Sequence, residues 1–565
     1  MQHLGRDTKT TDELKFIDYI GRVYGQDVYI AKMIEQIDGV PTPKIRIFKD
    51  VEVPFWITKP IARTHKQKKE YESMDKLDKY WATQSGLARE IATRVKVGKL
   101  PQYAKMRDVR DSPYVYALDI PVTSWIKDWY IRNGAQTAWK ICPLDIEVNV
   151  KDHFNEYITH IAITMEHASC LTVMRERFNG KGYANDEEIK EDIKRNYIDY
   201  VPNGKELWDA KPREIVLCDS PVEMIEHIFK RLHEWKPDFV PIWNLNYDIP
   251  KIIEAYEERA GKSMAQLFND PDVPSQYAYF NFNEGNNKIV TILDNGKEKI
   301  KTKKFHEIWH DVTSSASFKF IDAMGLYYQI RSQEPGVEGG YGLENILNTV
   351  LSIGKVKDDS KLKKKAWHVD TSDNRPAFYS CYGMFDVDSM LLLDKKTQDL
   401  ESSGASQLGA APWGRFSSLP YRCHIAFHFA ILKDGYVVGS KASKIEKDSI
   451  LGIGGGWIVT VPSYRILPNG LKVIEEDENV HTSHFPFVYD LDEVSAYPFA
   501  TVAANVSKET TNCEIKTIEG HNKDSFLKQN VNIVINKVNA YTYANHMLGL
   551  PSFKSLYEMD YNPQN

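Results

Sequence analysis

The chain has 565 residues, more than a single hydrophobic core supports, so we expect roughly three or four domains. Hydrophobic residues make up 42% and aromatic residues 12% of the sequence, enough for well-packed globular domains. The net charge of -6 excludes a simple basic nucleic-acid coat protein. A nucleic-acid enzyme stays compatible with it, because metal-binding acids can cancel basic grooves.

The cysteines and the N-terminal segment indicate a compartment. The six cysteines include no C-x-x-C pair, so neither a zinc site nor a disulfide framework is expected, which favours a reducing, cytosolic setting. The N-terminal residues are polar, and no apolar run approaches the length of a membrane span. We therefore expect a soluble intracellular protein with no membrane partner.

Residues 1–138 are predicted to form an N-terminal domain of mixed structure. Runs rich in β-branched residues predict strands at 26–34 and 43–49. The basic stretch 63–81 suggests a helix, and its charges are most simply explained as a solvated helix face.

From Trp139 onward the pattern alternates between strands and amphipathic helices. Residues 139–150 and 157–165 predict two adjacent strands. Residues 220–235 predict a one-sided helix with Ser220 as its N-cap, and residues 238–244 predict another buried strand. Strand, strand, helix and strand within one module indicate an α/β domain.

Residues 287–305 predict a β-hairpin around Asp294-Asn295-Gly296. One arm is rich in lysine, which is compatible with an ordinary solvated hairpin or with a ribbon that contacts phosphates. The lysines that would bind DNA are Lys299, Lys301 and Lys303. Residues 404–414 resemble an exposed loop, and the glycine-rich residues 451–459 suggest the entry into a last domain.

Three separate segments carry acids in a suitable context for catalysis. Asp145 and Glu147 are two apart on a predicted strand and project from one face, although such a pair is often only a charged sheet end. Asp248 follows a buried strand, where α/β sheets build their sites. Tyr382 and Asp386 are four apart on a predicted helix and share a face.

Clustered carboxylates cannot all ionise without cations between them, and oxygen ligands favour Mg²⁺ or Mn²⁺. Two such ions roughly 3.5–4 Å apart can activate a water and stabilise the leaving oxygen of a phosphodiester. The Tyr382 hydroxyl would help to orient that water. Asp388 does not share the face of Asp386, and we expect it to be a surface charge.

The three segments resemble the Exo I, Exo II and Exo III motifs of DnaQ-like 3′–5′ exonucleases, as found in family B DNA polymerases. Further segments, such as "FIDAMGLYY", "GLENIL" and "YGMFDVDSMLLLDKKTQ", are similar in order to T-even-type bacteriophage polymerases. The resemblance implies a ribonuclease H-like exonuclease domain at 139–399 that binds two Mg²⁺ (or Mn²⁺) ions. Asp145, Glu147, Asp248 and Asp386 would be its ligands, and Lys355 would assist.

The resemblance also implies DNA partners. They are primer–template DNA and single-stranded 3′ ends, and the basic hairpin lies where these polymerases have a hairpin that helps to move the primer end. The family usually has a hydrophobic residue three positions after the assisting lysine, whereas this chain has Asp358.

Residues 492–498, "DEVSAYP", are similar to motif A of the family B palm, where the family usually has Leu at the position of Ala496. The resemblance makes Asp492 a catalytic metal ligand, joined by the carbonyl of Glu493. Ser495 and Ala496 would contact the nucleotide, and Tyr497 would be the steric gate against ribose. Spacing alone does not separate Asp492 from Asp490, and the following Ser-x-Tyr-Pro favours Asp492. The resemblance also gives Gly455 and Gly456 contacts with the template.

The fingers motif and motif C of the family do not follow Tyr497, and "VDTSD" at 369–373 only mimics motif C. We therefore expect an α/β and α+β multidomain protein that forms the N-terminal subunit of a split family B DNA polymerase. It would comprise an N-terminal domain (1–138, joined by about 400–452), the exonuclease domain and a partial palm (453–565). A second polymerase chain, dNTP in the assembled enzyme and a sliding clamp would be its partners, in the cytoplasm of an infected bacterial cell.

Three alternatives stay open at this point. The chain can be a stand-alone 3′–5′ exonuclease with a vestigial palm, or a non-catalytic primer–template scaffold. The retained acids argue against a scaffold, which does not need them. A truncated sequence is the third alternative.

Overall fold

The computed structural model divides into two units, Met1–Ile450 and Leu451–Asn565. In the first unit it describes residues 9–65, 68–95, 101–149, 156–292, 298–332, 340–356, 362 and 365–440. In the second unit it describes five short strands, which form an antiparallel pair and a three-stranded sheet. These are β19 (Tyr464–Leu467) with β20 (Gly470–Val473), and β21 (Cys513–Ile515), β22 (Ile533–Ile535) and β23 (Val538–Asn539).

The first unit begins with a three-stranded antiparallel sheet of β1 (Glu13–Val23), β2 (Gln26–Ile37) and β3 (Val40–Lys49). The strands predicted at 26–34 and 43–49 are confirmed as parts of β2 and β3. Helix α3 (Val122–Asn133) packs against β1 and buries three aromatic side chains in the shared core.

The helix expected at 63–81 is wrong. The segment instead contributes β5 (Tyr71–Ser73), a 3-10 turn and β6 (Leu77–Ala82). Strand β6 pairs along its whole length with β4 (Val53–Thr58), and the Tyr80 ring packs 5.7 Å from that of Phe55. Tertiary pairing therefore outweighs the local helical pattern. Strand β7 (Val115–Tyr116) completes this sheet on the other side of β4.

The exposed loop expected at 404–414 is also wrong. Residues Gly404–Leu408 form helix α13, and Leu408, Ala411 and Trp413 are buried. The Trp413 ring packs edge-on against Phe239, 4.9 Å away. The small residues of this segment therefore allow close packing rather than an open loop. Further on, β18 (Tyr436–Val438) pairs with β5, so the region after residue 400 joins the N-terminal strands.

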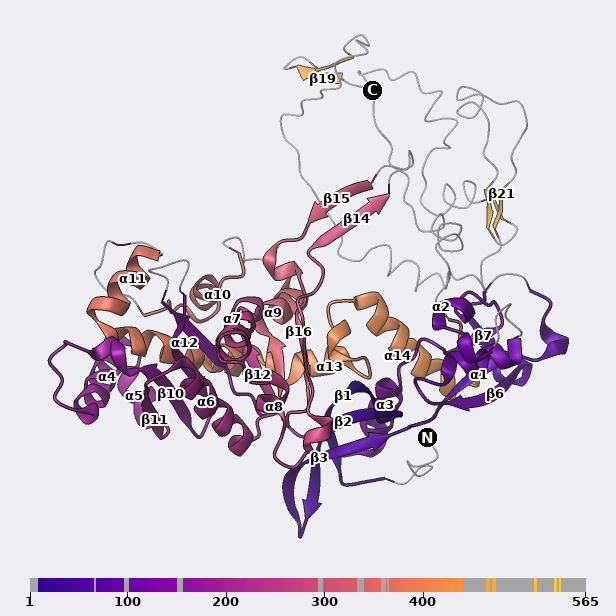
Figure 1. Ribbon diagram of the computed structural model, residues 1–565. Coiled ribbons are helices and arrows are strands. Elements are labelled where there is room, and N and C mark those ends of the chain that lie inside the picture. The colour runs from indigo at the N-terminus through magenta and orange to yellow at the C-terminus, as the bar shows by residue number, and fades with distance from the viewer. Residues whose placement is uncertain are drawn as a thin grey trace. The chain divides into compact units, whose positions relative to one another are not determined.

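The α/β class is confirmed by the central part of the first unit, which contains two four-stranded sheets (Figure 1). One sheet has the order β11-β10-β9-β8, with β8, β9 and β10 antiparallel and β11 parallel to β10. The strands predicted at 139–150 and 157–165 are thus adjacent, as expected. Its members are β8 (Leu144–Val148), β9 (Ile158–Thr164), β10 (Ser169–Met174) and β11 (Arg213–Cys218).

The second sheet has the order β12-β17-β16-β13 and continues beside β8. Ile141 forms a parallel bridge with Phe239, and the Cys142 amide donates to the Phe239 carbonyl at 2.8 Å, so β12 runs next to the segment that enters β8. The strands of this second sheet are β12 (Phe239–Ile242), β13 (Phe280–Asn283), β16 (Asp311–Ser314) and β17 (Lys319–Asp322).

Two helices cover opposite faces of the first sheet. The predicted helix is α6 (Pro221–Trp235), and the Ser220 hydroxyl caps it by accepting the Glu223 amide at 3.2 Å. Ile161 and Ile163 of β9 lie in the core that α6 shares, whereas Ala162 between them lies in the core of α12 (Pro376–Thr397). Alternate residues of a strand therefore face α6 and α12 in turn.

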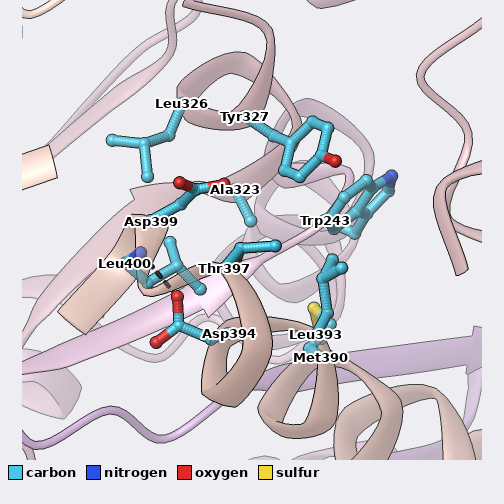
Figure 2. Close-up of a pocket in the computed structure, with 10 residues that line it drawn as sticks. All are labelled: Trp243, Ala323, Leu326, Tyr327, Met390, Leu393, Asp394, Thr397, Asp399 and Leu400. Atoms are coloured by element: carbon cyan, nitrogen blue, oxygen red, sulfur yellow. Dashed lines mark hydrogen bonds between the residues drawn. The ribbon is translucent and has the colours of Figure 1, made fainter. Parts of the chain in front are cut away.

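Helix α12 is buried along most of its length, and Tyr327 of α9 (Ala323–Arg331) lies in the same hydrophobic core as Met390 and Leu393 near the C-terminal end of α12. Figure 2 shows Trp243 and Tyr327 meeting Met390 and Leu393 of α12 around a small cavity. Its volume is about 10 Å³, room for at most one water, so this cavity is part of the core and not a ligand site. Asp394 closes the helix end by accepting the Leu400 amide at 2.6 Å.

The remaining helices flank these sheets, and the hairpin of β14 (Lys288–Ile292) and β15 (Glu298–Thr302) extends from the first unit (Figure 1). Both arms predicted for the hairpin are confirmed, while its expected turn at 294–296 lies outside the described residues. The other helices are α1 (Leu87–Val95), α2 (Met106–Val109), α4 (Asp186–Tyr200), α5 (Gly204–Asp209), α7 (Leu245–Ile253), α8 (Met264–Phe268), α10 (Leu343–Leu351), α11 (Lys365–Asn374) and α14 (Leu419–Lys433).

Candidate metal centre

Strand β8 presents its two acids on the face that α12 covers. Leu144, Ile146 and Val148 enter the core shared with α6, so Asp145 and Glu147 project to the other side. A Cβ atom added to Gly383 of α12 would lie 3.6 Å from the Glu147 Cγ, which shows how closely the helix passes. The predicted one-sided display of these acids is therefore confirmed.

Helix α12 brings the third predicted segment to the same place. Tyr382 and Asp386 are both buried and lie one helical turn apart, as their spacing predicts. One ligand oxygen each of Asp145, Glu147 and Asp386 lie within 4.8 Å of one another, so these three residues could hold a metal ion.

Asp248 is the fourth acid and lies in the first turn of α7. The sequence suggested a loop at this position, but the helix already begins at Leu245. Its side chain is buried, with 3% exposed. The Asp248 Oδ2 and Asp386 Oδ1 atoms have no hydrogen-bond partner among the described residues. Buried carboxylate oxygens without partners are costly, and bound cations would relieve that cost.

The electrostatics of the cluster reflect repulsion between acids in a poorly solvated place. Burial raises the pKa of Asp145 well above its usual range, and Asp386, Asp248 and Glu147 raise it further. Burial and Asp386 raise the pKa of Glu147 to about 7. Burial, followed by the Glu147 charge, raises the pKa of Asp248 well above its usual range. Such a group of carboxyls favours cation binding.

Lys355 is a basic residue that contacts the acid cluster. Its Nζ donates to the Tyr382 hydroxyl at 2.8 Å and forms an ion pair with Asp386. Burial alone would lower the pKa of Lys355, but electrostatic attraction to Asp386, Tyr382 and Asp145 outweighs it and raises the pKa well above its usual range. Burial raises the pKa of Asp386, and the charge and hydrogen bond of Lys355 oppose this rise, but the net direction is upward.

Two site residues were missed by sequence reasoning. The Tyr379 hydroxyl donates to Glu147 Oε2 at 2.6 Å, and His368 Nδ1 lies 3.0 Å from the same hydroxyl. Tyr379 precedes Tyr382 by three residues on α12, so the helical spacing already places both tyrosines on one face. A cavity of about 320 Å³ lies beside Glu147, and its lining includes Tyr379 and His368.

The expectation that Asp388 is a surface charge is wrong. Its side chain is 3% exposed and forms ion pairs with Lys211 at 2.9 Å and Arg213 at 2.7 Å. Tyr197 and Thr164 add hydrogen bonds at 2.5 and 2.9 Å. Asp388 is therefore a compensated buried acid, and its partners are different residues from those of the metal-capable cluster.

A second group with metal-ligand atoms consists of Cys170, Glu214 and His227, within 4.8 Å of one another. Arg231 donates to both Glu214 oxygens at 2.7 Å, and burial raises the pKa of the Cys170 thiol well above its usual range. Metal ligation needs a thiolate and free carboxylate oxygens, so this group is a poorer candidate than the acids of β8 and α12.

Of the predicted DNA-contact lysines, Lys299 and Lys301 are exposed on the hairpin strand β15, and Lys303, just beyond it, is partly buried. Lys301 pairs in register with Ile289, so lysine and apolar side chains share one face of the ribbon. The remaining predicted site residues lie outside the described residues. These are Asp492, Glu493, Ser495, Ala496, Tyr497, Gly455 and Gly456.

Comparison with known proteins gives no assignment. No protein-family model matches the chain, and no curated protein matches it. In the part of the chain that the structure describes, no helix is both long and apolar enough to cross a membrane.

Proposed function

We propose that the chain is a 3′–5′ DNA exonuclease whose active centre is formed by the acids of β8, α7 and α12. The observation that carries this proposal is the convergence of Asp145, Glu147 and Asp386, whose ligand oxygens lie within 4.8 Å of one another. Three segments separated by about a hundred residues or more supply the cluster and Asp248, in the order that the resemblance to DnaQ-like exonucleases implies.

The strand order is compatible with the ribonuclease H-like fold that this resemblance implies. Strands β8, β9 and β10 are antiparallel, and β12 lies parallel to the segment entering β8 on its other side. Asp145 and Glu147 therefore project from a strand in the middle of a continuous arrangement of strands, and Asp248 and Asp386 approach them from helices α7 and α12.

The unpaired oxygens of Asp248 and Asp386 fit Mg²⁺ or Mn²⁺, which prefer oxygen ligands. Asp145, Glu147, Asp248 and Asp386 would hold the ions. When bound, two ions supply an activated water and stabilise the charge on the leaving oxygen of a phosphodiester.

Lys355 and Tyr382 have a role that follows from their hydrogen bond. Because Lys355 donates to the Tyr382 oxygen, the Tyr382 hydroxyl proton is directed to another acceptor. Tyr382 would use this proton to orient the attacking water or a phosphate oxygen. Lys355 would hold both Tyr382 and Asp386 in position through its two contacts.

The proposal is tested with a 5′-labelled single-stranded oligonucleotide. The purified chain should shorten it stepwise from the 3′ end with Mg²⁺ and not with EDTA. Asp145→Ala combined with Glu147→Ala should abolish shortening. Glu187→Ala with Glu191→Ala removes the same charge from exposed positions of α4 and should leave the rate unchanged. Tight DNA binding without shortening would instead favour a scaffold.

A second proposed activity, DNA synthesis, rests on the similarity of residues 492–498 to motif A. We propose that Asp492 contributes one metal ligand to a family B polymerase site, together with a fingers lysine and a motif C supplied by sequence other than these 565 residues. Primer extension should then require that added polypeptide. Template-directed extension by this chain alone would contradict the proposal that the fingers lysine and motif C are supplied by other sequence.

A further inference from the structure

A hydrogen-bonded chain leads away from the acid cluster into the aromatic side chains beside it. The Tyr379 hydroxyl lies 2.6 Å from Glu147 Oε2, and His368 Nδ1 lies 3.0 Å from the Tyr379 oxygen. His368 belongs to α11 and Tyr379 to α12, so two helices meet in supporting one ligand on β8.

The direction of this chain follows from the number of protons available. A carboxylate that binds a metal only accepts hydrogen bonds, so the single Tyr379 proton points to Glu147. The Tyr379 oxygen then accepts, and His368 must donate from Nδ1–H. The contact thereby fixes one neutral tautomer of His368, with Nε2 as its acceptor nitrogen.

The packing around Tyr379 leaves its ring one orientation. The side chain is 1% exposed, and its ring stacks on Tyr382 with centroids 5.9 Å apart and an interplanar angle of 10°. His160 packs against it edge-on at 5.3 Å, and Trp367 lies 6.2 Å away. A phenol held in this way can fix the carboxylate that it touches, since its own rotation is blocked by neighbours.

We propose that His368 and Tyr379 are positioning residues that hold Glu147 in its metal-binding orientation. The inference rests on the proposed function, because it assigns to Glu147 the role of a ligand. The inference goes beyond the proposed function by assigning a role to two residues that would support a metal ligand without contacting the metal or the reacting atoms. Outer hydrogen bonds of this kind orient ligands, and their loss typically weakens metal affinity by about 10–100-fold.

The decisive measurement is binding of Mn²⁺ to the DNA-free protein, followed by calorimetry or electron paramagnetic resonance. Tyr379→Phe keeps the ring and removes the donor, so Mn²⁺ should bind roughly 10- to 100-fold more weakly. Tyr197→Phe is the matched control, since Tyr197 is another buried tyrosine that donates to a carboxylate, that of Asp388. It should leave Mn²⁺ affinity unchanged.

Substitutions at His368 provide a second, independent test of the positioning role. Asn places an amide N–H near the position of Nδ1, whereas Leu has no donor. His368→Leu should weaken Mn²⁺ binding and His368→Asn should restore most of it. Because His368 and Tyr379 also line the cavity beside Glu147, kinetics are measured as well. At saturating Mn²⁺ the rate of shortening should recover, while the KM for DNA stays near that of the unsubstituted protein.

The outcomes separate this inference from the proposed function. Equal Mn²⁺ affinity in Tyr379→Phe and the unsubstituted protein, with Leu and Asn indistinguishable at position 368, would overturn the positioning role alone. If Asp145→Ala with Glu147→Ala binds Mn²⁺ as tightly as the unsubstituted protein, the proposed metal centre itself is refuted. Should Tyr379→Phe fail to fold, the comparison of the two His368 variants decides.

Discussion

The acid cluster should make the metal-free protein less stable as the pH rises, and Glu147→Gln should remove part of that loss. Burial and Asp386 raise the Glu147 pKa from 4.5 to about 7 in the folded protein. The folded state therefore binds the proton more tightly than the unfolded state. Its stabilising effect is complete below about pH 4.5 and is lost as the pH approaches 7.

The size of the effect follows from the shift. A change of about 2.5 pKa units corresponds to roughly 3 kcal/mol at about 1.4 kcal/mol per unit. The Glu147 side chain is 12% exposed and shares its protons with other acids, so we expect about 2 kcal/mol. For a module of about 150–250 residues this amounts to a rise in Tm of roughly 4–8 °C for Glu147→Gln at pH 8.

The measurement is thermal unfolding in EDTA at pH 5 and pH 8, with Asp388→Asn as control. Burial alone would raise the pKa of Asp388, but Arg213 and Lys211 outweigh it and lower the pKa. The ionised Asp388 therefore stabilises the fold above its unfolded pKa, and that contribution is lost only as the pH falls through its lowered folded value. Asp388→Asn should lower Tm at pH 8. A Glu147→Gln variant that is unchanged or less stable at pH 8 would refute the reasoning.

Three further predictions concern the surroundings of the cluster. Lys355→Met should slow single-turnover DNA shortening about 10- to 100-fold, because Tyr382 loses its support, while Mn²⁺ affinity does not fall; an unchanged rate would contradict the role of Lys355. Gly383→Ala should raise stability to denaturant by about 0.5–1 kcal/mol, since the added Cβ makes ordinary contact with Glu147; a marked loss of stability would show that the space is insufficient. Replacing three hairpin lysines by alanine should make the negative slope of log K against log salt for single-stranded DNA shallower by roughly 2, and an unchanged slope would show that the hairpin does not contact the DNA. These lysines are Lys299, Lys301 and Lys303.

Much of the cluster could be predicted because it depends on local geometry. Period-two alternation places Asp145 and Glu147 on one face of β8, and the helical repeat places Tyr382 and Asp386 on one face of α12. Lys355 was proposed only from the family resemblance, and its contact with Asp386 needs the fold to bring two distant segments together.

The rest could not be predicted because it depends on partners distant in sequence. Asp388 is buried only because Lys211 and Arg213 approach it from the region of β11. The contact of Tyr379 with Glu147 arises from how α12 crosses β8, which the sequence of the helix alone does not specify. The charged segment 63–81 lacks a strand pattern of its own, and it becomes β5 and β6 through pairing with β18 and β4.

The most direct test of the proposed exonuclease centre is to locate Mn²⁺ by anomalous diffraction from crystals of the chain soaked with Mn²⁺ and a short single-stranded oligonucleotide. We expect two peaks roughly 3.5–4 Å apart, bound by Asp145, Glu147, Asp248 and Asp386, with the 3′ end beside them. No peak among these acids, or Mn²⁺ bound only at Cys170, Glu214 and His227, would contradict it.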